Sequence, residues 1–206
     1  MEKGSANLKN DGRLAQLFRQ NDGFVTRKDA VAERIDPHEL SEWVETGRAE
    51  RIQPGIYRAV DAPPLSNEFL LEVILRAPQG VVALRSALDF HNLGTISPSA
   101  IDLAIPRKSH APTFGYPPVN FFYFNDPMIS YGVEEHSLGP TKLRVFSPEK
   151  TLADLLYYRN TIGISTFVEG LQDYLAKPGA NTAALMEAAQ KRRVATTIRP
   201  YLEALL

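Results

Sequence analysis

The chain has 206 residues, of which 44% are hydrophobic and 23% are charged, values that are ordinary for a globular protein. It contains no cysteine, which excludes disulfides, zinc–thiolate sites and thiol nucleophiles. The formal net charge of −1 means that nucleic-acid binding would have to depend on a local basic surface. No apolar run reaches the roughly 18 residues of a membrane-spanning helix, and the polar N-terminus is unlike a secretory signal, so we expect a cytoplasmic protein.

A stiff segment, Asp61-Ala62-Pro63-Pro64, interrupts the chain after its first third. Each proline fixes its own φ angle and biases the preceding residue toward extended geometry. We therefore place a domain boundary here, with one domain over residues 1–62 and a second over residues 63–206. The predicted fold class is α+β.

Two short helices are predicted at the start of the first domain. The first ends at the turn Asn21-Asp22-Gly23, and the second begins at Thr26, where Asp29 can complete a capping box. The apolar residues that we expect to face inward from these helices are Leu14, Leu17, Phe18, Ala30, Val31 and Ile35.

A third helix is predicted from Asp36, a good N-cap followed by Pro37, to Gly47, which can take the left-handed conformation that ends a helix. Its expected inward residues are Leu40, Trp43 and Val44. Residues 48–60 then form two β-prone stretches around Pro54-Gly55, a hairpin signal. Three helices followed by a basic hairpin is the order of a winged helix-turn-helix, a fold that commonly binds DNA.

The run GFVTRKDAVAERIDPHELSEWVETGRAERIQPGIYRAV resembles the N-terminal domain of AbiEi-type antitoxins. The resemblance depends on residues 23–27, on Leu40, Val44 and Gly47, and on the hairpin residues Arg51 and 54–58, and it continues over residues 12–206. It implies an antitoxin that also regulates transcription of a type IV toxin–antitoxin operon. The implied partners are operator DNA and a nucleotidyltransferase-like toxin encoded nearby, and we expect a monomer or a weak homodimer.

The predicted third helix is acidic for a DNA-reading helix, and residues 1–60 contain ten Lys or Arg against ten Asp or Glu. Favourable charge must then come from residues outside that helix. The expected phosphate contacts are Arg27, Lys28, Arg48, Arg51 and Arg58. The expected contacts to base edges are His38, Ser41, Glu42 and Gln53. Two alternatives are an ordinary solvated surface and a module that binds protein.

The second domain is predicted to be mixed α/β and to end in several helices. A helix runs from the cap Ser66 to about Arg76, with Phe69, Leu70, Val73 and Ile74 inward, and residues 81–84 are a brief strand or the lead into a helix over 85–93. Residues 101–105 and 119–124 are strands, the second nearly all apolar and therefore central. A hairpin over 132–138 and 141–146 turns at Gly139-Pro140, and helices follow to about 159 and near 164–176, 182–191 and 194–206, the last kinked or restarted at Pro200.

This second domain also resembles the AbiEi-type C-terminal region. The residues that carry the resemblance are Ser86-Ala87-Leu88 with His91 and Leu93-Gly94, and the segment from Phe146 to Asp154. The resemblance implies that this region supplies the antitoxin activity.

Three groups of residues could suggest chemistry, but simpler interpretations account for each. Ser86 and His91 are five residues apart, too far for a helical pair, and fit helix ends. Asp102 with Lys108 lacks the second carboxylate of a two-metal site and fits a polar strand face before a basic loop. Residues 134–136 offer two ligands on one strand face, too few for a metal site.

The remaining charges fit helix ends: Glu149-Lys150 at a helix start and Lys191-Arg192-Arg193 at a helix end. The alternative for Lys191-Arg192-Arg193 is a contribution to a DNA-facing surface. We therefore expect a two-domain regulator with no catalytic residues, no metal and no cofactor. A protein-interaction module and a metal-dependent nucleic-acid-processing enzyme built on Asp102 are the alternatives.

Overall fold

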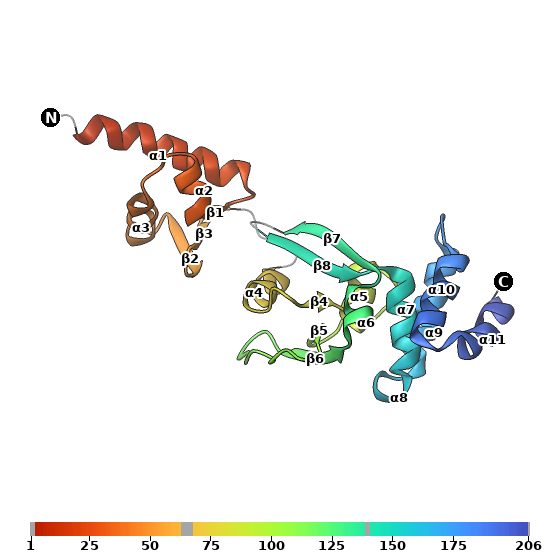
Figure 1. The fold of residues 1–206 in the computed structure, drawn as a ribbon. Coiled ribbons are helices and arrows are strands. Elements are labelled where there is room, and N and C mark those ends of the chain that lie inside the picture. Colours follow the sequence, from red (N-terminus) through yellow and green to blue (C-terminus); the bar gives the residue numbers. More distant parts are fainter. Residues whose placement is uncertain (1–2, 63–67, 139–140, 206) are drawn as a thin grey trace. The chain divides into compact units, whose positions relative to one another are not determined.

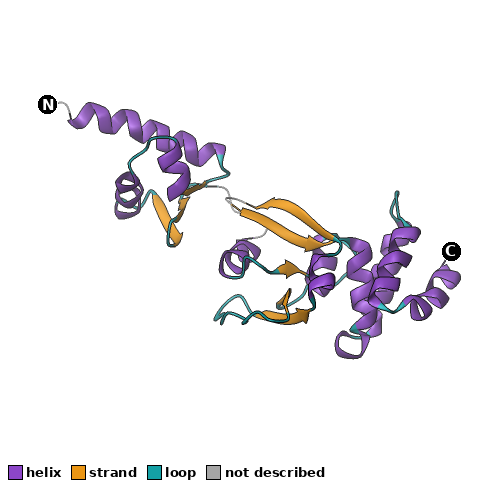
Figure 2. Ribbon diagram, in the orientation of Figure 1, coloured by secondary structure: helices purple, strands orange, loops and turns teal. Residues whose placement is uncertain are grey.

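The computed structural model describes residues 3–62, 68–138 and 141–205 (Figures 1 and 2). It contains both helices and sheets, which confirms the α+β class. The chain divides into two compact units, Met1–Glu72 with Ser137–Lys142, and Val73–His136 with Leu143–Leu206. The expected hinge prolines Pro63-Pro64, the cap Ser66 and the turn Gly139-Pro140 lie outside the described residues, and the boundary after residue 62 stays a prediction.

The first unit consists of helices packed on a small antiparallel sheet. Its elements are α1 (Lys3–Gln20), β1 (Phe24–Thr26), α2 (Arg27–Ala32), α3 (Pro37–Glu45), β2 (Ala49–Gln53) and β3 (Ile56–Ala59). The three predicted helices and the hairpin are confirmed. The strand β1 was not predicted; it pairs with β3, so the sheet order is β1-β3-β2.

Local capping interactions fix where α2 and α3 begin. The Thr26 hydroxyl accepts a hydrogen bond from Asp29 N at 3.1 Å, and the Asp29 carboxylate accepts one from Thr26 N at 3.0 Å, which confirms the capping box. Asp36 caps α3 by accepting from His38 N at 2.9 Å, and Pro37 follows it as expected. Gly47 ends α3 with φ +70°, the left-handed conformation that the sequence predicts.

The end of α2 is less usual, because an arginine occupies the left-handed position. Arg34 N donates to Val31 O at 3.0 Å and Ile35 N donates to Ala30 O at 2.8 Å, the bonding pattern of a Schellman motif. Arg34 has φ +56° at the site where glycine is usual. A side chain with a Cβ costs about 1 kcal/mol or more in this conformation.

The core of the first unit joins α1 and α3 to the sheet. Leu14, Leu17, Phe18 and Leu40 are buried, and the rings of Phe18 and Trp43 stack with centroids 5.2 Å apart. The expectation that Val31 faces inward is wrong, since its side chain is 57% exposed. The helix α2 ends at Ala32, so its single buried residue is Ala30, and Ile35 enters the core from the turn after the helix.

The rest of the chain builds a mixed sheet with helices packed on it (Figures 1 and 2). The strands are β4 (Val81–Val82), β5 (Ile101–Pro106), β6 (Val119–Phe124), β7 (Val133–Leu138) and β8 (Thr141–Phe146), in the order β6-β5-β4-β8-β7. The helices are α4 (Glu68–Arg76), α5 (Leu84–Phe90), α6 (Asp126–Ser130), α7 (Pro148–Tyr157), α8 (Arg159–Ile162), α9 (Ile164–Ala176), α10 (Thr182–Arg192) and α11 (Ala195–Leu205). The pairs β5–β6 and β4–β8 are parallel, and β4–β5 is antiparallel.

Several expectations for this part of the chain are corrected. The strand β6 is at an edge of the sheet and not at its centre. Phe69 is 53% exposed, because the buried face of α4 is formed by Leu71, Val73 and Ile74 instead. Of the two effects expected at Pro200, the restart is wrong, because α11 continues through this residue, and the kink stays a prediction.

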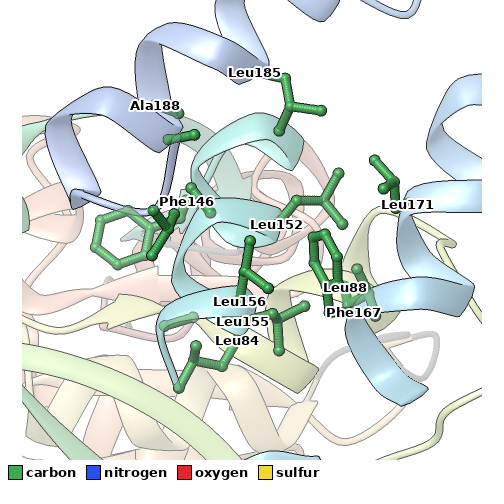
Figure 3. Close-up of a cluster of buried hydrophobic side chains, with 14 of the residues drawn as sticks. Leu84, Leu88, Phe146, Leu152, Leu155, Leu156, Phe167, Leu171, Leu185 and Ala188 are labelled. Carbon is green, nitrogen blue, oxygen red and sulfur yellow. The ribbon is translucent and has the colours of Figure 1, made fainter. Parts of the chain in front are cut away.

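The hydrophobic core of the second unit lies between α5, α7, α9 and α10. Figure 3 shows Leu152, Leu155 and Leu156 of α7 surrounded by side chains from the neighbouring helices and from the end of β8. The surrounding residues that the figure labels are Leu84, Leu88, Phe146, Phe167, Leu171, Leu185 and Ala188. The helix α7 is therefore buried along most of its length and organises the domain.

An ion pair between the partly exposed Arg85 and the buried Asp102 links α5 to the sheet. Arg85 donates to both oxygens of Asp102, each at 2.7 Å, and Asn120 donates to Asp102 Oδ1 at 3.0 Å. The Ser86 hydroxyl accepts from Asp102 N at 2.9 Å. The interpretation of Asp102 as a polar strand face is thus wrong, because this carboxylate is completely buried and serves the fold.

A second buried charge cluster joins α7 to α10. Lys150 donates to Asp154, and Arg192 Nε lies 2.8 Å from Asp154 Oδ1, while the Arg192 guanidinium lies over the Tyr157 ring at 3.7 Å. Burial raises the pKa of Asp154 and lowers that of Lys150, and the attraction between the opposite charges opposes both changes. Lys150 and Arg192 lie at the start of α7 and at the end of α10, as expected, and there they pair with the buried Asp154.

Candidate nucleic-acid interface

The helix α3 presents one polar stripe to the outside of the first unit. Residues 38, 41, 42 and 45 are spaced as neighbours on one helical face, and the opposite face carries the buried Leu40 and Trp43. His38, Glu42 and Glu45 are exposed and Ser41 is partly exposed. The three predicted base contacts on α3 thus lie together on one accessible surface.

The start of α2 and the turn of the hairpin form a second surface, which we call the α2–turn corner (Arg27, Lys28, Gln53, Pro54 and Gly55). Arg27 N donates to Gly55 O at 2.8 Å, and Gly55 has φ +82°. Ile56 of the central strand pairs with Thr26 on one side and with Gln53 on the other. Arg27 and Lys28 are exposed, so this corner offers two cations beside a polar turn.

Arg51 and Arg48 lie at different places around the hairpin. Arg51 is exposed on β2, next to an irregularity in the pairing between Arg51 and Gln53. Arg48 follows the end of α3, where its guanidinium carbon is 4.7 Å from the Trp43 ring centroid and its Nε donates to Thr46 at 3.1 Å. Arg48 is thus exposed but held at the end of α3 farthest from His38.

The position of Arg58 differs from the expectation of a phosphate contact. Its side chain is only 11% exposed, its Nη1 lies 3.7 Å from Glu50, and its guanidinium carbon lies 5.7 Å from the Phe24 ring centroid. The central strand β3 directs this side chain across the sheet, so the pairing of β1 with β3, which was not predicted, is the reason that Arg58 is covered.

Arg34 is an exposed cation that sequence reasoning did not single out. It stands in the turn between α2 and α3, within four residues of His38, and its left-handed conformation positions it at the N-terminal end of α3. The signal that could have found it is a basic residue in the turn of a predicted helix-turn-helix. By contrast, Arg13 donates to Glu33 O at 3.0 Å and thereby caps the end of α2.

The charges around α3 are therefore divided by position. The stripe itself carries carboxylates at Glu42 and Glu45, whereas Arg34 flanks its beginning and the α2–turn corner supplies Arg27 and Lys28. Exposed cations of this kind can bind phosphate groups, and a carboxylate on the stripe can accept from the cytosine amino group.

The candidate chemical groups of the second unit do not form a catalytic constellation in the described residues. The Ser86 hydroxyl accepts a hydrogen bond from the main-chain N–H of Asp102. His91 Nε2 donates to Phe146 O at 2.8 Å, and burial lowers the pKa of the imidazole. Glu134 and His136 share one strand face, as expected, and His136 Nε2 lies 3.4 Å from Glu134 Oε2. Across the described part of the chain, no group of three possible ligands surrounds a metal position.

Comparisons with known proteins give two findings. The crystal structure of the RV2827C protein from Mycobacterium tuberculosis is similar in fold, with a TM-score of 0.55 and 15% sequence identity over 95% of this chain and 81% of that one. A comparison with curated proteins gave no match. Within the described residues, no helix combines the length and the apolar character that crossing a bilayer requires.

The second finding concerns the first unit alone. Residues 13–60 match the family model described as transcriptional regulator, AbiEi antitoxin, which confirms the resemblance over this segment. The matched segment contains α2, α3 and the hairpin, and with them the polar stripe and the α2–turn corner. Residues 13–60 are thus similar in sequence to the AbiEi antitoxin family of transcriptional regulators.

Proposed function

We propose that this chain is a DNA-binding transcriptional regulator that represses its own operon and acts as the antitoxin of a type IV toxin–antitoxin pair. In this proposal residues 13–60 are a winged helix-turn-helix, in which α2 and α3 form the helix-turn-helix and the β2–β3 hairpin is the wing. The order of these elements and the match to a family of transcriptional regulators support the assignment.

The single observation that carries the proposal is the accessible α3 stripe with cations at its flanks. His38, Ser41 and Glu42 would meet base edges in the major groove. The flanking cations Arg34, Arg27 and Lys28 would neutralise phosphates, with Arg51 and Gln53 of the hairpin reaching the adjacent backbone. In this proposal Arg48 contacts the DNA backbone from the end of α3 farthest from His38. Arg58 is not a proposed DNA contact, because its side chain is covered.

The test is a salt-titrated binding assay on the DNA upstream of the protein's own operon. Each lost phosphate contact should reduce the magnitude of the negative slope of log K against log salt concentration by about 0.9. We expect this change for Arg27→Ala, Lys28→Ala and Arg51→Ala. Lys108→Ala, which removes an exposed charge from the second unit, is the matched control and should leave the slope unchanged. Absence of binding at low salt would overturn the proposal.

The partner of the second unit is proposed to be a nucleotidyltransferase-like toxin encoded next to this gene, and the chain itself is proposed to act without catalysis. Co-expression of the neighbouring toxin with residues 68–206 or with the full chain tests this part. Rescue of growth by both supports an antitoxin role for the second unit. Failure of the full chain to rescue growth contradicts it, whatever the result of the DNA assay.

A second candidate is a protein-interaction module, which the carboxylates Glu42 and Glu45 on the exposed α3 stripe favour. A basic partner would pair with them, whereas a phosphate backbone would be repelled. This candidate predicts no salt-dependent DNA binding and a complex with a basic protein that Glu42→Gln weakens.

A further inference from the structure

The edge strand β6 has a composition that suits the interior of a sheet. Its sequence, VNFFYF, contains no charged residue and no proline, and it pairs with β5 in unbroken register from Val119 to Phe124. Natural edge strands are usually protected from further pairing by lysine, proline, a bulge or short length. The opposite edge, β7, has such protection in Glu134, Glu135 and His136. The edge strand β6 contains no lysine, no proline and no bulge.

Hydrogen bonds at the two ends of β6 show which main-chain groups face outward. Pro118 O accepts from Ile101 N at 2.9 Å, and Phe124 O accepts from Arg107 N at 2.8 Å. Residues along a parallel strand alternate between bonding to one side and bonding to the other. The even-numbered residues therefore face β5. The N–H and C=O groups of Val119, Phe121 and Tyr123 point away from it, where no other described strand pairs with them.

Aromatic side chains pack on both faces of β6, while Asn120 and Tyr123 remain exposed. On one face Phe122 packs against Tyr158, with ring centroids 5.3 Å apart. On the other face Phe121 packs against Phe114, with ring centroids 6.0 Å apart. The Arg76 guanidinium carbon lies 4.5 Å from the Phe114 ring centroid. Tyr123, at the same edge, is 48% exposed.

We propose that β6 pairs antiparallel with β6 of a second copy of this chain, about a two-fold axis that passes through Phe121. In this register Phe121 lies opposite Phe121 of the second copy, and Val119 lies opposite Tyr123. All of the outward main-chain groups of the three residues are then used, in about six hydrogen bonds. Aromatic and β-branched pairs across the strands add to the stability of the pairing.

A second copy fits this edge because the strand is complementary to itself. The two-fold axis places Val119 opposite the aromatic ring of Tyr123, and an uncharged strand brings no like charges together across the axis. An isologous contact of this kind uses both β6 edges and closes, whereas the charged β7 edges remain outside. The proposal does not depend on DNA binding.

The absence of cysteine from the chain allows a direct test in the full-length protein. Facing residues of a hydrogen-bonded antiparallel pair have Cα atoms about 5.5 Å apart, within the range of a disulfide. Phe121→Cys should therefore cross-link to itself on oxidation. In Tyr123→Cys, the matched control, the two cysteines would be about 13 Å apart along the strands. We expect the first variant to cross-link at least about tenfold faster, and equal rates would overturn the proposal.

Sedimentation equilibrium of the full chain provides a readout that does not require a change in Phe121. An interface of one strand from each copy is small, so we expect weak association that appears only at high protein concentration. Tyr123→Lys should abolish it, because a lysine at an edge strand opposes pairing. Val31→Lys, an equally exposed position in the first unit, should retain it. A monomeric wild-type chain at every concentration, or association that Tyr123→Lys leaves unchanged, contradicts the pairing.

Discussion

The main-chain N–H of Arg27 donates to the carbonyl of Gly55 at 2.8 Å, so the first turn of α2 and the turn of the hairpin are held together. Together with the pairing of Thr26 and Ile56, this bond joins two parts of the sequence that are 28 positions apart, residues 27 and 55, into one surface. Because the bond uses main-chain atoms, it leaves the side chains of Arg27 and Lys28 available for a ligand.

Replacement of Arg34 should separate stability from binding. Glycine adopts φ +56° without a Cβ penalty, so Arg34→Gly should raise the free energy of unfolding of the first unit by up to about 1 kcal/mol. The same variant should bind operator DNA more weakly, with a lower salt slope. The fluorescence of Trp43, which is the one tryptophan of the chain and lies in the first unit, follows the unfolding.

The control for Arg34→Gly is Asn92→Gly, which replaces another left-handed residue, φ +52°, in the second unit. It should leave both the Trp43 transition and DNA binding unchanged. If Arg34→Gly binds DNA as tightly as the parent chain, Arg34 is not a phosphate contact.

Arg51 and Arg58 lie on neighbouring strands of one sheet but should respond in opposite ways. Arg51→Ala should weaken DNA binding with little effect on stability, since its side chain is exposed. Arg58→Ala should lower the free energy of unfolding by about 1 kcal/mol, because the covered side chain packs on Phe24 and pairs with Glu50. Urea unfolding and the salt-titrated assay, applied to both variants, compare the effects. A larger binding defect in Arg58→Ala would contradict the assignment.

Loss of Arg192 should destabilise the second unit strongly. Arg192→Ala leaves the buried Asp154 with Lys150 as its one ion-pair partner among the described residues, and it empties the space beside Tyr157. Removal of one member of a buried ionic cluster typically costs about 3–5 kcal/mol. The change is measured by urea unfolding followed by circular dichroism. Arg199→Ala, an exposed arginine on the next helix, should change the same transition by less than about 0.5 kcal/mol.

The second unit should lose stability in mild acid through His91. Burial lowers the pKa of its imidazole, so the unfolded chain binds a proton there at a higher pH than the folded chain does. The contribution of His91 is therefore complete above about pH 6.5, the unfolded value, and falls as the pH decreases through the lower folded value. His91→Gln keeps a donor for Phe146 O but cannot titrate. Its free energy of unfolding should depend less on pH between about 5 and 7 than that of the parent chain, and identical profiles would contradict this account.

Local signals explain why the first unit could be largely predicted. The capping box of Thr26 and Asp29, the Asp36-Pro37 start and the Gly47 end each involve residues within a few positions of one another. The strand β1 was missed because its partner, β3, is about 30 positions away and three residues carry little alternation. That missed pairing is also why Arg58 was expected on the surface.

Sequence reasoning failed in the second unit where distant charges meet. The i,i+4 spacing of Lys150 and Asp154 was a usable signal, but no pattern indicates that Arg192 joins them. The placement of β6 failed for a different reason. Apolar residues on a strand indicate packing on its faces, not a neighbouring strand at each edge. Phe121 packs against Phe114 and Phe122 against Tyr158, although no described strand lies at the outer edge of β6.

The contact between Arg192 and Asp154 also sets an order of events during synthesis. Asp154 leaves the ribosome well before Arg192, and until α10 follows, the carboxylate and the apolar side of α7 have no cover from that helix. The second unit can therefore complete this part of its core only after residue 192 has been made. A message cut short before codon 192 would yield an intact first unit joined to an unfinished, protease-sensitive second one.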